Sequence, residues 1–118
     1  MKKINIIKKN DEFTRIIKNN RSFKSKYFII YVEKNEEEIY HFGLSVGKKV
    51  GNAVTRNKEK RRIKSILDKF IFKKGFNCII IVKREIVDKS FKEMEEDLIF
   101  AIKILDIIKE SKDEEKKY

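Results

Sequence analysis

The chain has 118 residues, 41% of them hydrophobic, which suffices for one domain with a modest core and excludes a wholly disordered chain. Charged residues make up 42%, against roughly 25% in an average globular domain, and the net charge of +11 indicates a polyanionic partner. Residues 1–64 carry 18 Lys and Arg against 7 Asp and Glu, whereas residues 65–118 carry 12 of each. We therefore expect the anion-binding surface in the first part, while the second part mainly completes the fold.

The N-terminus and the cysteine content indicate the compartment. Residues 1–9 contain no apolar region long enough for a signal peptide, and no run approaches the roughly 20 apolar residues of a membrane span. Cys78 is the only cysteine and lies in an apolar run, so we expect a buried, inert thiol. Without a second cysteine there is no internal disulfide, which fits a reducing cytosol. We expect a cytoplasmic protein without membrane contact.

The first predicted element is a helix that Asn10 can cap. Acidic residues follow the cap, as the positive end of the helix dipole favours. The spacing i, i+3, i+4 places Phe13, Ile16 and Ile17 on one face. Residues 19–20, both Asn, are expected to end this helix.

Strands are expected after the first helix. A short strand is expected near residues 22–24, and the aromatic and β-branched run at 27–32 predicts a second. The alternating pattern at 39–46 predicts a third, after a polar loop at 33–38. The simplest arrangement of the two longer strands is an antiparallel pair.

The second half of the chain predicts helix, strand and helix. Asn52 can cap a helix over residues 53–70, and Gly75 precedes a buried strand at 76–82. The last helix begins at a capping box formed by Ser90 and Glu93, and it is amphipathic.

The end of the chain is mostly charged. We expect residues 111–118 to form a disordered tail beyond a domain of residues 1–110. The order of elements within that domain predicts a single-domain α+β sandwich, with helices packed on a small sheet.

Residues 48–64 are the most informative segment, with eight basic residues and one acid in 17 positions. On a helix, at about 100° per residue, one arc carries the apolar residues Ile63, Ile66, Leu67 and Phe70. The neighbouring arc carries Asn57, Lys60, Arg61 and Lys64, and the charge is extended by Lys58 and Arg62. Cations at this density pair with phosphates. The alternative is a merely solvated basic helix, which the shortage of acids for i, i+4 pairs disfavours.

Asn57 adds no charge to this segment, and it suggests a specific backbone or 2′-OH contact or a role at the helix start.

A longer run around this segment closely resembles the signature of the bacterial ribonuclease P protein family. The run is Gly43-Leu-Ser-Val-Gly-Lys-Lys-Val-Gly-Asn-Ala-Val-Thr-Arg-Asn-Lys-Glu-Lys-Arg-Arg-Ile-Lys64. Its core is matched by Arg56, Asn57, Lys60 and Arg61. Lys58 and Lys64 stand where the family usually has arginine, which keeps the charge but loses bidentate geometry. The similarity covers about residues 8–108.

The resemblance implies a fold and a function. The fold is an α-β-β-β-α-β-α sandwich with a left-handed crossover, ribosomal protein S5 domain 2-like, over residues 1–110. The protein is expected to be the noncatalytic subunit of ribonuclease P, which removes the 5′ leader from precursor tRNA and leaves a 5′-phosphate on the mature end. The catalytic RNA is expected to carry out the hydrolysis with Mg²⁺, so the protein itself has no catalytic residue, metal ligand or bound cofactor.

The resemblance also implies two sites. Contacts with the catalytic RNA are expected from Lys48, Lys49, Asn52, Arg56, Asn57, Lys58, Lys60, Arg61 and Lys64. A cleft for the single-stranded leader, between the first helix and the sheet, is expected to contain Lys9, Phe13, Ile17 and Tyr31, since aromatic platforms beside cations bind single strands. Ile17 stands where relatives often carry a second aromatic residue. From periodicity alone, Phe13 and Ile17 are more simply explained as core.

Two alternatives come from other classes of protein. A ribosomal or general RNA-binding protein would also have a basic helix, but the ordered Gly-Asn-Ala-Val stretch disfavours it. A metal nuclease could use the acids at 36–38 or 95–97, but adjacent acids on a helix point to different faces and a loop of glutamates is usually solvated. His41, the only histidine, is expected as a strand residue without an acid–base partner. The class of the partner RNA, the leader preference, dimerisation and non-tRNA substrates stay open.

Overall fold

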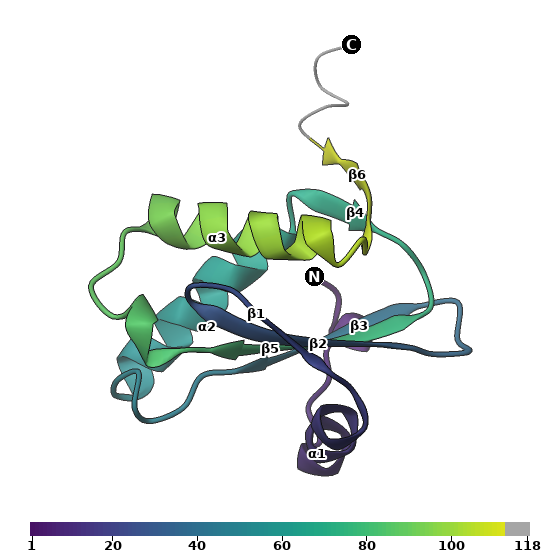
Figure 1. Cartoon of the computed structure of the whole chain (residues 1–118), viewed down its shortest axis with the longest axis horizontal. Coiled ribbons are helices and arrows are strands. Elements are labelled where there is room, and N and C mark those ends of the chain that lie inside the picture. The colour runs from purple at the N-terminus through teal and green to yellow at the C-terminus, as the bar shows by residue number, and fades with distance from the viewer. Residues whose placement is uncertain (113–118) are drawn as a thin grey trace.

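A four-stranded sheet with helices on both faces forms the centre of the molecule (Figure 1). The computed structural model describes residues 1–112. The elements in chain order are α1 (Asn10–Asn19), β1 (Ser22–Lys24), β2 (Phe28–Lys34), β3 (Tyr40–Ser45), α2 (Ala53–Leu67), β4 (Phe70–Phe72), β5 (Phe76–Val82), α3 (Phe91–Ile104) and β6 (Ile108–Ser111). Short 3₁₀ turns lie at Lys3–Asn5 and Arg84–Ile86. The α+β class and the predicted element order are confirmed, and β4 and β6 are additions to that order.

Strand β5 lies inside the sheet, whose order is β1-β2-β5-β3. It pairs antiparallel with β2 and parallel with β3, so the predicted antiparallel pair of β2 with β3 is wrong. The reason is the composition of β5, in which Cys78, Ile79 and Ile80 are each 0% exposed. Consecutive buried side chains need cover on both faces of the sheet, which an inner strand receives. The parallel pair requires a crossover connection, and α2 lies within it.

The helix starts follow the predicted caps with one exception. Asn52 accepts a hydrogen bond from the backbone N–H of Thr55 at 3.0 Å, and Ser90 forms the predicted capping box. Asn10 does not cap α1: it is the first helical residue, and Lys9 occupies the cap position without a side-chain hydrogen bond. Helix α1 ends at Asn19, as predicted.

The basic helix is shorter than predicted and ends at Leu67 instead of Phe70. The residues after it form β4, which pairs antiparallel with β6. Phe70 and Phe72 alternate with a half-buried residue and are themselves buried, so a strand places both rings in the core. Strand β6 includes Ser111, the first residue of the predicted tail. Residues 113–118 of that tail lie outside the described residues.

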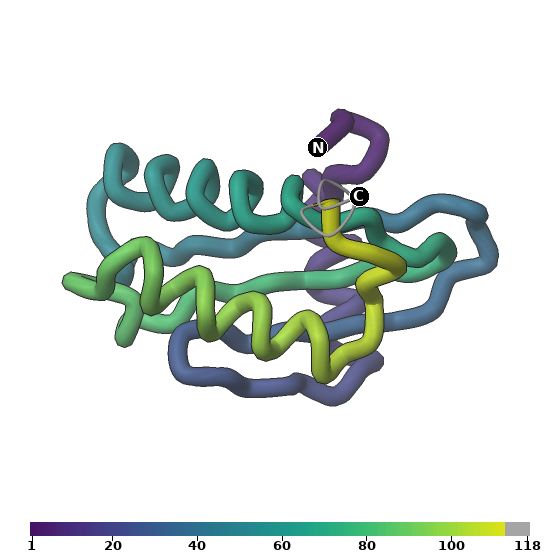
Figure 2. The backbone as a smooth tube through the Cα atoms, turned by 90° about the horizontal axis from the view of Figure 1, so that it is seen from above, coloured from purple at the N-terminus to yellow at the C-terminus, as the bar shows by residue number. Residues whose placement is uncertain are grey.

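Helices α2 and α3 lie side by side over one face of the sheet, and α1 crosses the other (Figures 1 and 2). The larger core lies on the α2–α3 face and includes Phe28, Ile30, Phe42, Ile63, Ile66, Leu67, Cys78, Ile80, Met94, Leu98 and Ile102. A smaller cluster under α1 contains Ile7, Ile16 and Ile79. Burial raises the pKa of the Cys78 thiol far above its ordinary value, so the predicted inert, buried cysteine is confirmed.

Candidate RNA-binding surface

Helix α2 presents its basic residues because its apolar residues anchor it on the core. Ile63, Ile66 and Leu67 are 0–1% exposed. The opposite side carries the exposed residues Asn57, Lys58, Arg61 and Ser65. The predicted division of the helix into a docked face and a basic face therefore holds.

The start of α2 is held by a close backbone approach. A Cβ atom on Gly51 would lie 2.8 Å from Thr55 Cγ2, so the absence of a side chain allows the first turn to pack against the preceding residue. Lys48 and Lys49 are exposed in the turn just before, which the bond from the Val50 N–H to the Gly47 carbonyl closes at 3.1 Å. These predicted RNA contacts thus lie at the entrance of the helix.

Three more cations of α2 point in two other directions. Arg62 pairs with Glu59 at 3.4 Å, and its guanidinium lies 5.9 Å from the centre of the Phe91 ring, toward α3. Lys60 and Lys64 are half-buried and line a groove toward α1. The sequence analysis placed these two lysines on one arc of the helix with Asn57 and Arg61. In the structure α1 and β3 partly cover the flank with Lys60 and Lys64, whereas Asn57 and Arg61 on the other flank are exposed.

The groove between α1, β3 and α2, here called the α1–α2 groove, has a volume of about 560 Å³. Its lining includes Ile6, Lys8, Phe13, Ile17, Leu44, Lys60 and Lys64. Apolar side chains of α1 therefore lie across from two lysines of the basic helix. The sequence predicted an RNA-binding helix and a separate leader cleft, and the structure joins them along this groove.

Phe13 sits close to the sheet because β3 has no side chain at Gly43. A Cβ atom there would lie 2.7 Å from the end of the Phe13 ring and 2.7 Å from Ile79 Cδ1. Phe13 and Ile17 are both half-buried and pack on the small cluster around Ile16. One side of each chain therefore packs on the core and the other lines the groove, and the binding of a leader by these two residues stays a prediction.

The other two predicted cleft residues lie near the α1–α2 groove without lining it. Tyr31 is half-buried on β2, opposite Ile79 in the register, so it shares the α1 face of the sheet. Lys9 is exposed at the start of α1, and its neighbour Lys8 lines the groove instead.

The N-terminal segment is a wall of this groove that the sequence interpretation missed. Ile6 forms a bridge beside Phe42 of β3, and the Ile7 N–H donates to the Phe42 carbonyl at 2.8 Å. Ile7 is buried under α1. The apolar residues of the first seven positions could have indicated a pairing segment, but they are too few to give a strand pattern.

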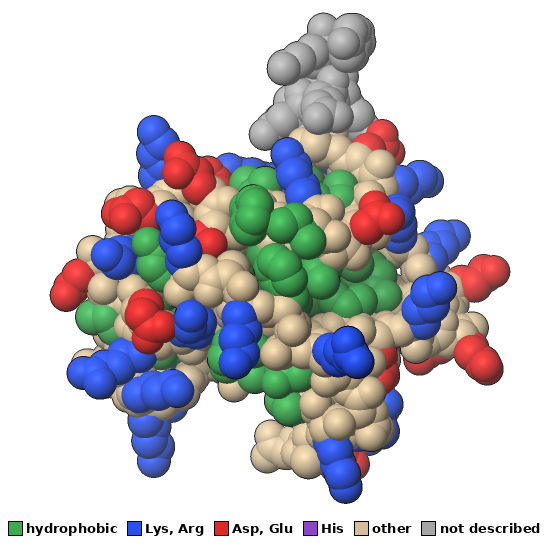
Figure 3. Space-filling model, viewed as in Figure 1, with side chains coloured by type: hydrophobic (Ala, Val, Ile, Leu, Met, Phe, Trp, Pro, Cys, Tyr) green, Lys and Arg blue, Asp and Glu red, His purple; other side chains and the backbone are tan. Residues whose placement is uncertain are grey.

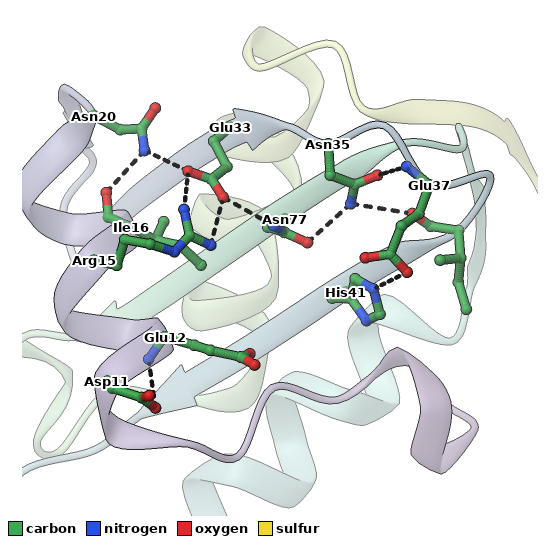
Figure 4. Close-up of polar contacts among 11 residues, drawn as sticks. Asp11, Glu12, Arg15, Ile16, Asn20, Glu33, Asn35, Glu37, His41 and Asn77 are labelled. Carbon is green, nitrogen blue, oxygen red and sulfur yellow. Dashed lines mark hydrogen bonds and ion pairs between the residues drawn. The ribbon is translucent and has the colours of Figure 1, made fainter.

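A polar network fixes the other end of α1 on the sheet (Figure 4). Glu33 of β2 accepts from Arg15 at 3.0 Å, from Asn20 at 3.0 Å and from Asn77 of β5 at 2.9 Å. Partial burial alone would raise the pKa of Glu33, but these hydrogen bonds and the Arg15 charge together lower that pKa below its ordinary value. The network holds α1 at a set position, and with it the groove.

His41 has an acidic neighbour that the sequence interpretation missed. Its ring lies 3.5 Å from Glu37 (Figure 4). The ring Nδ1 also lies 3.0 Å from the Ile4 carbonyl oxygen. The loop at 35–39 folds back so that Glu37, four residues earlier, reaches the strand. His41 is a strand residue, as predicted, but the expected lack of a partner is wrong.

Two acids of the run at 95–97 make structural contacts. Asp97 accepts from the Ser25 hydroxyl at 2.7 Å and from the Tyr27 N–H at 2.9 Å, and Glu95 pairs with Lys69. Among residues 1–112, no group of three or more His, Cys, Asp or Glu side chains is arranged to hold a metal ion. These acids attach α3 to the rest of the fold.

The face that carries α3 differs from the basic face of α2. Figure 3 shows Lys, Arg, Asp and Glu mixed on this side, with apolar side chains gathered around α3. Phe100 and Ile104 are 55% and 52% exposed there. Within the described part of the chain, no helix is long and apolar enough to cross a bilayer.

Comparisons with known proteins agree with this geometry. A family profile described as Ribonuclease P matches residues 1–106. The ribonuclease P protein component of Carboxydothermus hydrogenoformans is 38% identical over 109 residues, covering 89% of this chain and 94% of that one. The corresponding protein of Mycoplasma capricolum is 42% identical over 106 residues, covering 87% of this chain and 97% of that one.

Solved structures show the same fold. The RNase P protein of Staphylococcus aureus superposes with a TM-score of 0.79 at 31% identity, over 87% of this chain and 96% of that one. The RNase P protein of Thermotoga maritima gives a TM-score of 0.73 at 26% identity, over 80% of this chain and 92% of that one. The fold and the family resemblance predicted from the sequence are confirmed.

Proposed function

This chain belongs to the ribonuclease P protein family, and from that premise we propose that it binds two RNA segments of the ribonuclease P assembly. The outer face of α2 binds the catalytic RNA, and the α1 face of the sheet binds the 5′ leader of precursor tRNA. The observation that carries this proposal is the α1–α2 groove, in which Phe13 and Ile17 lie across from Lys60 and Lys64.

The outer face of α2 suits a folded RNA. Lys58 and Arg61 are exposed next to Asn57, and Lys48 and Lys49 extend the charge beyond the helix start. Cations in such a row neutralise successive phosphates, which contributes affinity without base preference. Because α2 is anchored by buried residues on its other side, this row is presented on a rigid element.

The α1–α2 groove suits a single strand. Bases stack on aromatic faces while cations follow the phosphates, and the half-buried Phe13 leaves part of its ring uncovered in the groove. Tyr31, also half-buried, lies outside the groove on the same face of the sheet. Lys60 and Lys64 supply the charge from the opposite wall. A leader lying here would run from the sheet toward the basic helix, and so toward the catalytic RNA.

We place the hydrolysis of the phosphodiester on the RNA subunit. The chain's contribution is to reduce phosphate repulsion and to hold the leader. Both proposed sites are lined chiefly by lysine, arginine and apolar side chains, which do not ligate Mg²⁺. Mg²⁺ ions bound to RNA phosphates would activate the attacking water.

The leader site is tested with Phe13→Ala in the reconstituted assembly. Stacking is worth roughly 1–3 kcal/mol per base, so affinity for precursor tRNA should fall about tenfold, while affinity for mature tRNA should barely change. Phe100→Ala is the matched control, since Phe100 is an exposed aromatic residue outside the groove. Equal losses for precursor and mature tRNA, together with a lower melting temperature, would return Phe13 to the core alone.

The catalytic RNA site is tested with Arg61→Ala, compared with Lys109→Ala on β6, which is also exposed. Loss of one phosphate contact should reduce the slope of log affinity against log salt by about 0.7–0.9. Lys109→Ala should leave that slope unchanged. An Arg61 variant with unchanged affinity and slope would show that α2 does not face the RNA.

The assignment of catalysis is tested by incubating the protein alone with precursor tRNA and Mg²⁺. We expect no site-specific cleavage until the catalytic RNA is added. Cleavage at the leader junction by the protein alone would place the chemistry on this chain.

A further inference from the structure

A second groove, here called the α2–α3 groove, lies between the first half of α2 and the segment that precedes α3. Its volume is about 580 Å³, which falls within the range of small-ligand sites. Val50 and Ile86 form its buried apolar floor, and Val87, 43% exposed, continues that floor to the surface. The groove lies on the flank of α2 opposite the α1–α2 groove.

Glu59, the only acid in α2, faces the α2–α3 groove and is only 7% exposed. Its Oε1 accepts from Arg62 at 3.4 Å, which is long for a hydrogen bond. Its Oε2 is buried and has no hydrogen-bond partner among residues 1–112. An unpaired buried acceptor destabilises the fold, and more so when it is charged. A ligand in the groove that donates a hydrogen bond to the carboxylate of Glu59 would complete its pairing.

The surroundings of Glu59 suit a nucleotide. The apolar floor offers a surface for a base, and the exposed Lys58 and Lys89 stand at the rim, where a phosphate would lie. Two other acids line the groove: Glu93 is engaged with Ser90 in the capping box, and Asp88 is exposed. Glu59 is therefore the one acid of this lining that is both buried and incompletely paired.

We propose that the α2–α3 groove binds one unpaired nucleotide of the catalytic RNA, whose base donates a hydrogen bond from an exocyclic amino group to the carboxylate of Glu59. Carboxylates accept from such amino groups, and proteins recognise RNA sequence mainly through unpaired bases. The inference rests on the proposed function, because it requires that α2 face the catalytic RNA. Lys58 lines the groove and also belongs to the outer face of α2, so an RNA on that face reaches the groove directly.

The direction in which one substitution changes the affinity for the catalytic RNA tests this inference. Glu59→Gln removes a negative charge from a helix that binds RNA, so electrostatics alone predicts tighter binding. The proposal predicts weaker binding, by about tenfold, because the hydrogen bond from the amino group then ends on a neutral amide oxygen and loses the strengthening by the carboxylate charge. Asp88→Asn is the matched control: it changes the charge equally in the same groove, and asparagine tolerates the φ of 68° at this position. Asp88→Asn should bind the RNA as tightly as the wild type or more tightly.

Chemical probing of the bound RNA gives a readout that a structural role of Glu59 would not change. The wild-type protein should protect the Watson–Crick edge of one unpaired base from modification by dimethyl sulfate or kethoxal. With Glu59→Gln that base should become reactive while the rest of the footprint stays. Val87→Phe, which narrows the groove from an exposed position, should release the same base. Protection that is unchanged in both variants would overturn the inference.

Two further outcomes separate the possible failures. If Arg61→Ala leaves RNA affinity unchanged, the proposed function of α2 fails first. If Arg61→Ala weakens binding but Glu59→Gln strengthens it, only the nucleotide site is refuted. A small polyamine is the other ligand that could donate to the carboxylate of Glu59. Spermidine added to both proteins without RNA gives a direct test. If it raises the melting temperature of the wild type but not of Glu59→Gln, and the RNA footprint is the same for both proteins, the ligand of the groove is an amine and the nucleotide proposal is refuted.

Discussion

The two faces of the central sheet use the same strands for different purposes. On the α2–α3 face, Phe28, Ile30 and Phe42 are 0–1% exposed beneath two helices. On the α1 face, Tyr31 and Ile81 stay half-buried, although each is adjacent in sequence to a fully buried isoleucine. One helix covers less of a sheet than two. The stability of the fold therefore comes mainly from one face, and the other leaves aromatic and apolar surface that a ligand can cover.

The attachment of α1 explains how the α1 face, here called the open face because part of it stays uncovered, remains ordered. The helix is held at one end by the Arg15–Glu33 pair and the amides around it, and in the middle by Ile16, which is 0% exposed. Polar contacts at the end and a small apolar cluster below place the helix without closing the sheet. The α1–α2 groove is what remains between this helix and α2.

The largest expected effect on stability is at the α2–α3 face, here called the closed face because two helices cover it. Phe42→Ala removes a ring packed against Phe72, Phe76 and Tyr40, with centroids 4.9, 5.6 and 5.7 Å away. The free energy of unfolding should fall by about 3–5 kcal/mol, as for other buried phenylalanines. Urea denaturation measures it, and precursor and mature tRNA binding should fall together. A loss below about 1 kcal/mol would mean that the stability of the fold does not come mainly from the α2–α3 face.

The second prediction concerns the neighbouring residue on the open face. Gly43→Ala would force the Phe13 ring and Ile79 aside, so the free energy of unfolding should fall by about 1–3 kcal/mol. Because Phe13 moves, affinity for precursor tRNA should fall more than affinity for mature tRNA. Gly47→Ala is the control, since no atom lies within 4 Å of the added Cβ. If both glycine variants behave alike, the close contact of Phe13 with β3 has no consequence for binding.

The closed face was largely predictable from sequence, because its signals are local. The capping box at Ser90, the cap at Asn52 and the strand at 76–82 each depend on a few adjacent residues, and all were confirmed. The position of β5 between β2 and β3 depends on contacts far apart in the chain. Alternation in each strand is satisfied by either order, and only the two-sided burial of β5 distinguishes them.

The candidate site was predictable in its residue types but not in its arrangement. Periodicity placed Lys60 and Lys64 on the basic helix, and the resemblance placed Phe13 and Ile17 in a cleft. Their shared groove depends on where α1 crosses the sheet, which Gly43 and Glu33 set through tertiary contacts. A single acid within a basic run, such as Glu59, gives no local signal of being buried.

A smaller effect is expected from the contact that orders the open face. The pKa of Glu33 is lowered in the folded protein, so its contribution to stability is complete above its ordinary pKa of 4.5 and is lost as the pH falls through the lowered value. Glu33→Gln should lower the free energy of unfolding at neutral pH by about 1 kcal/mol. The difference from the wild type should shrink below the ordinary pKa. The exposed Glu38→Gln is the control, and a difference that is constant with pH would exclude the ion pair as its cause.

The smallest expected effect gives the most closely matched comparison of the two faces. Ile80 and Ile81 are neighbours in β5, with the same side chain, and they point to opposite faces of the sheet. Removing one methyl group by Ile80→Val should cost about 1 kcal/mol, because the residue is 0% exposed and a cavity remains. Ile81→Val should cost less than about 0.5 kcal/mol, since solvent already reaches that side chain. Both variants keep a β-branched residue, so strand propensity does not differ. Urea denaturation with replicate m-values is needed to resolve this difference. Equal costs at the two positions would show that α1 closes its face of the sheet around Ile81 as completely as α2 and α3 close theirs around Ile80.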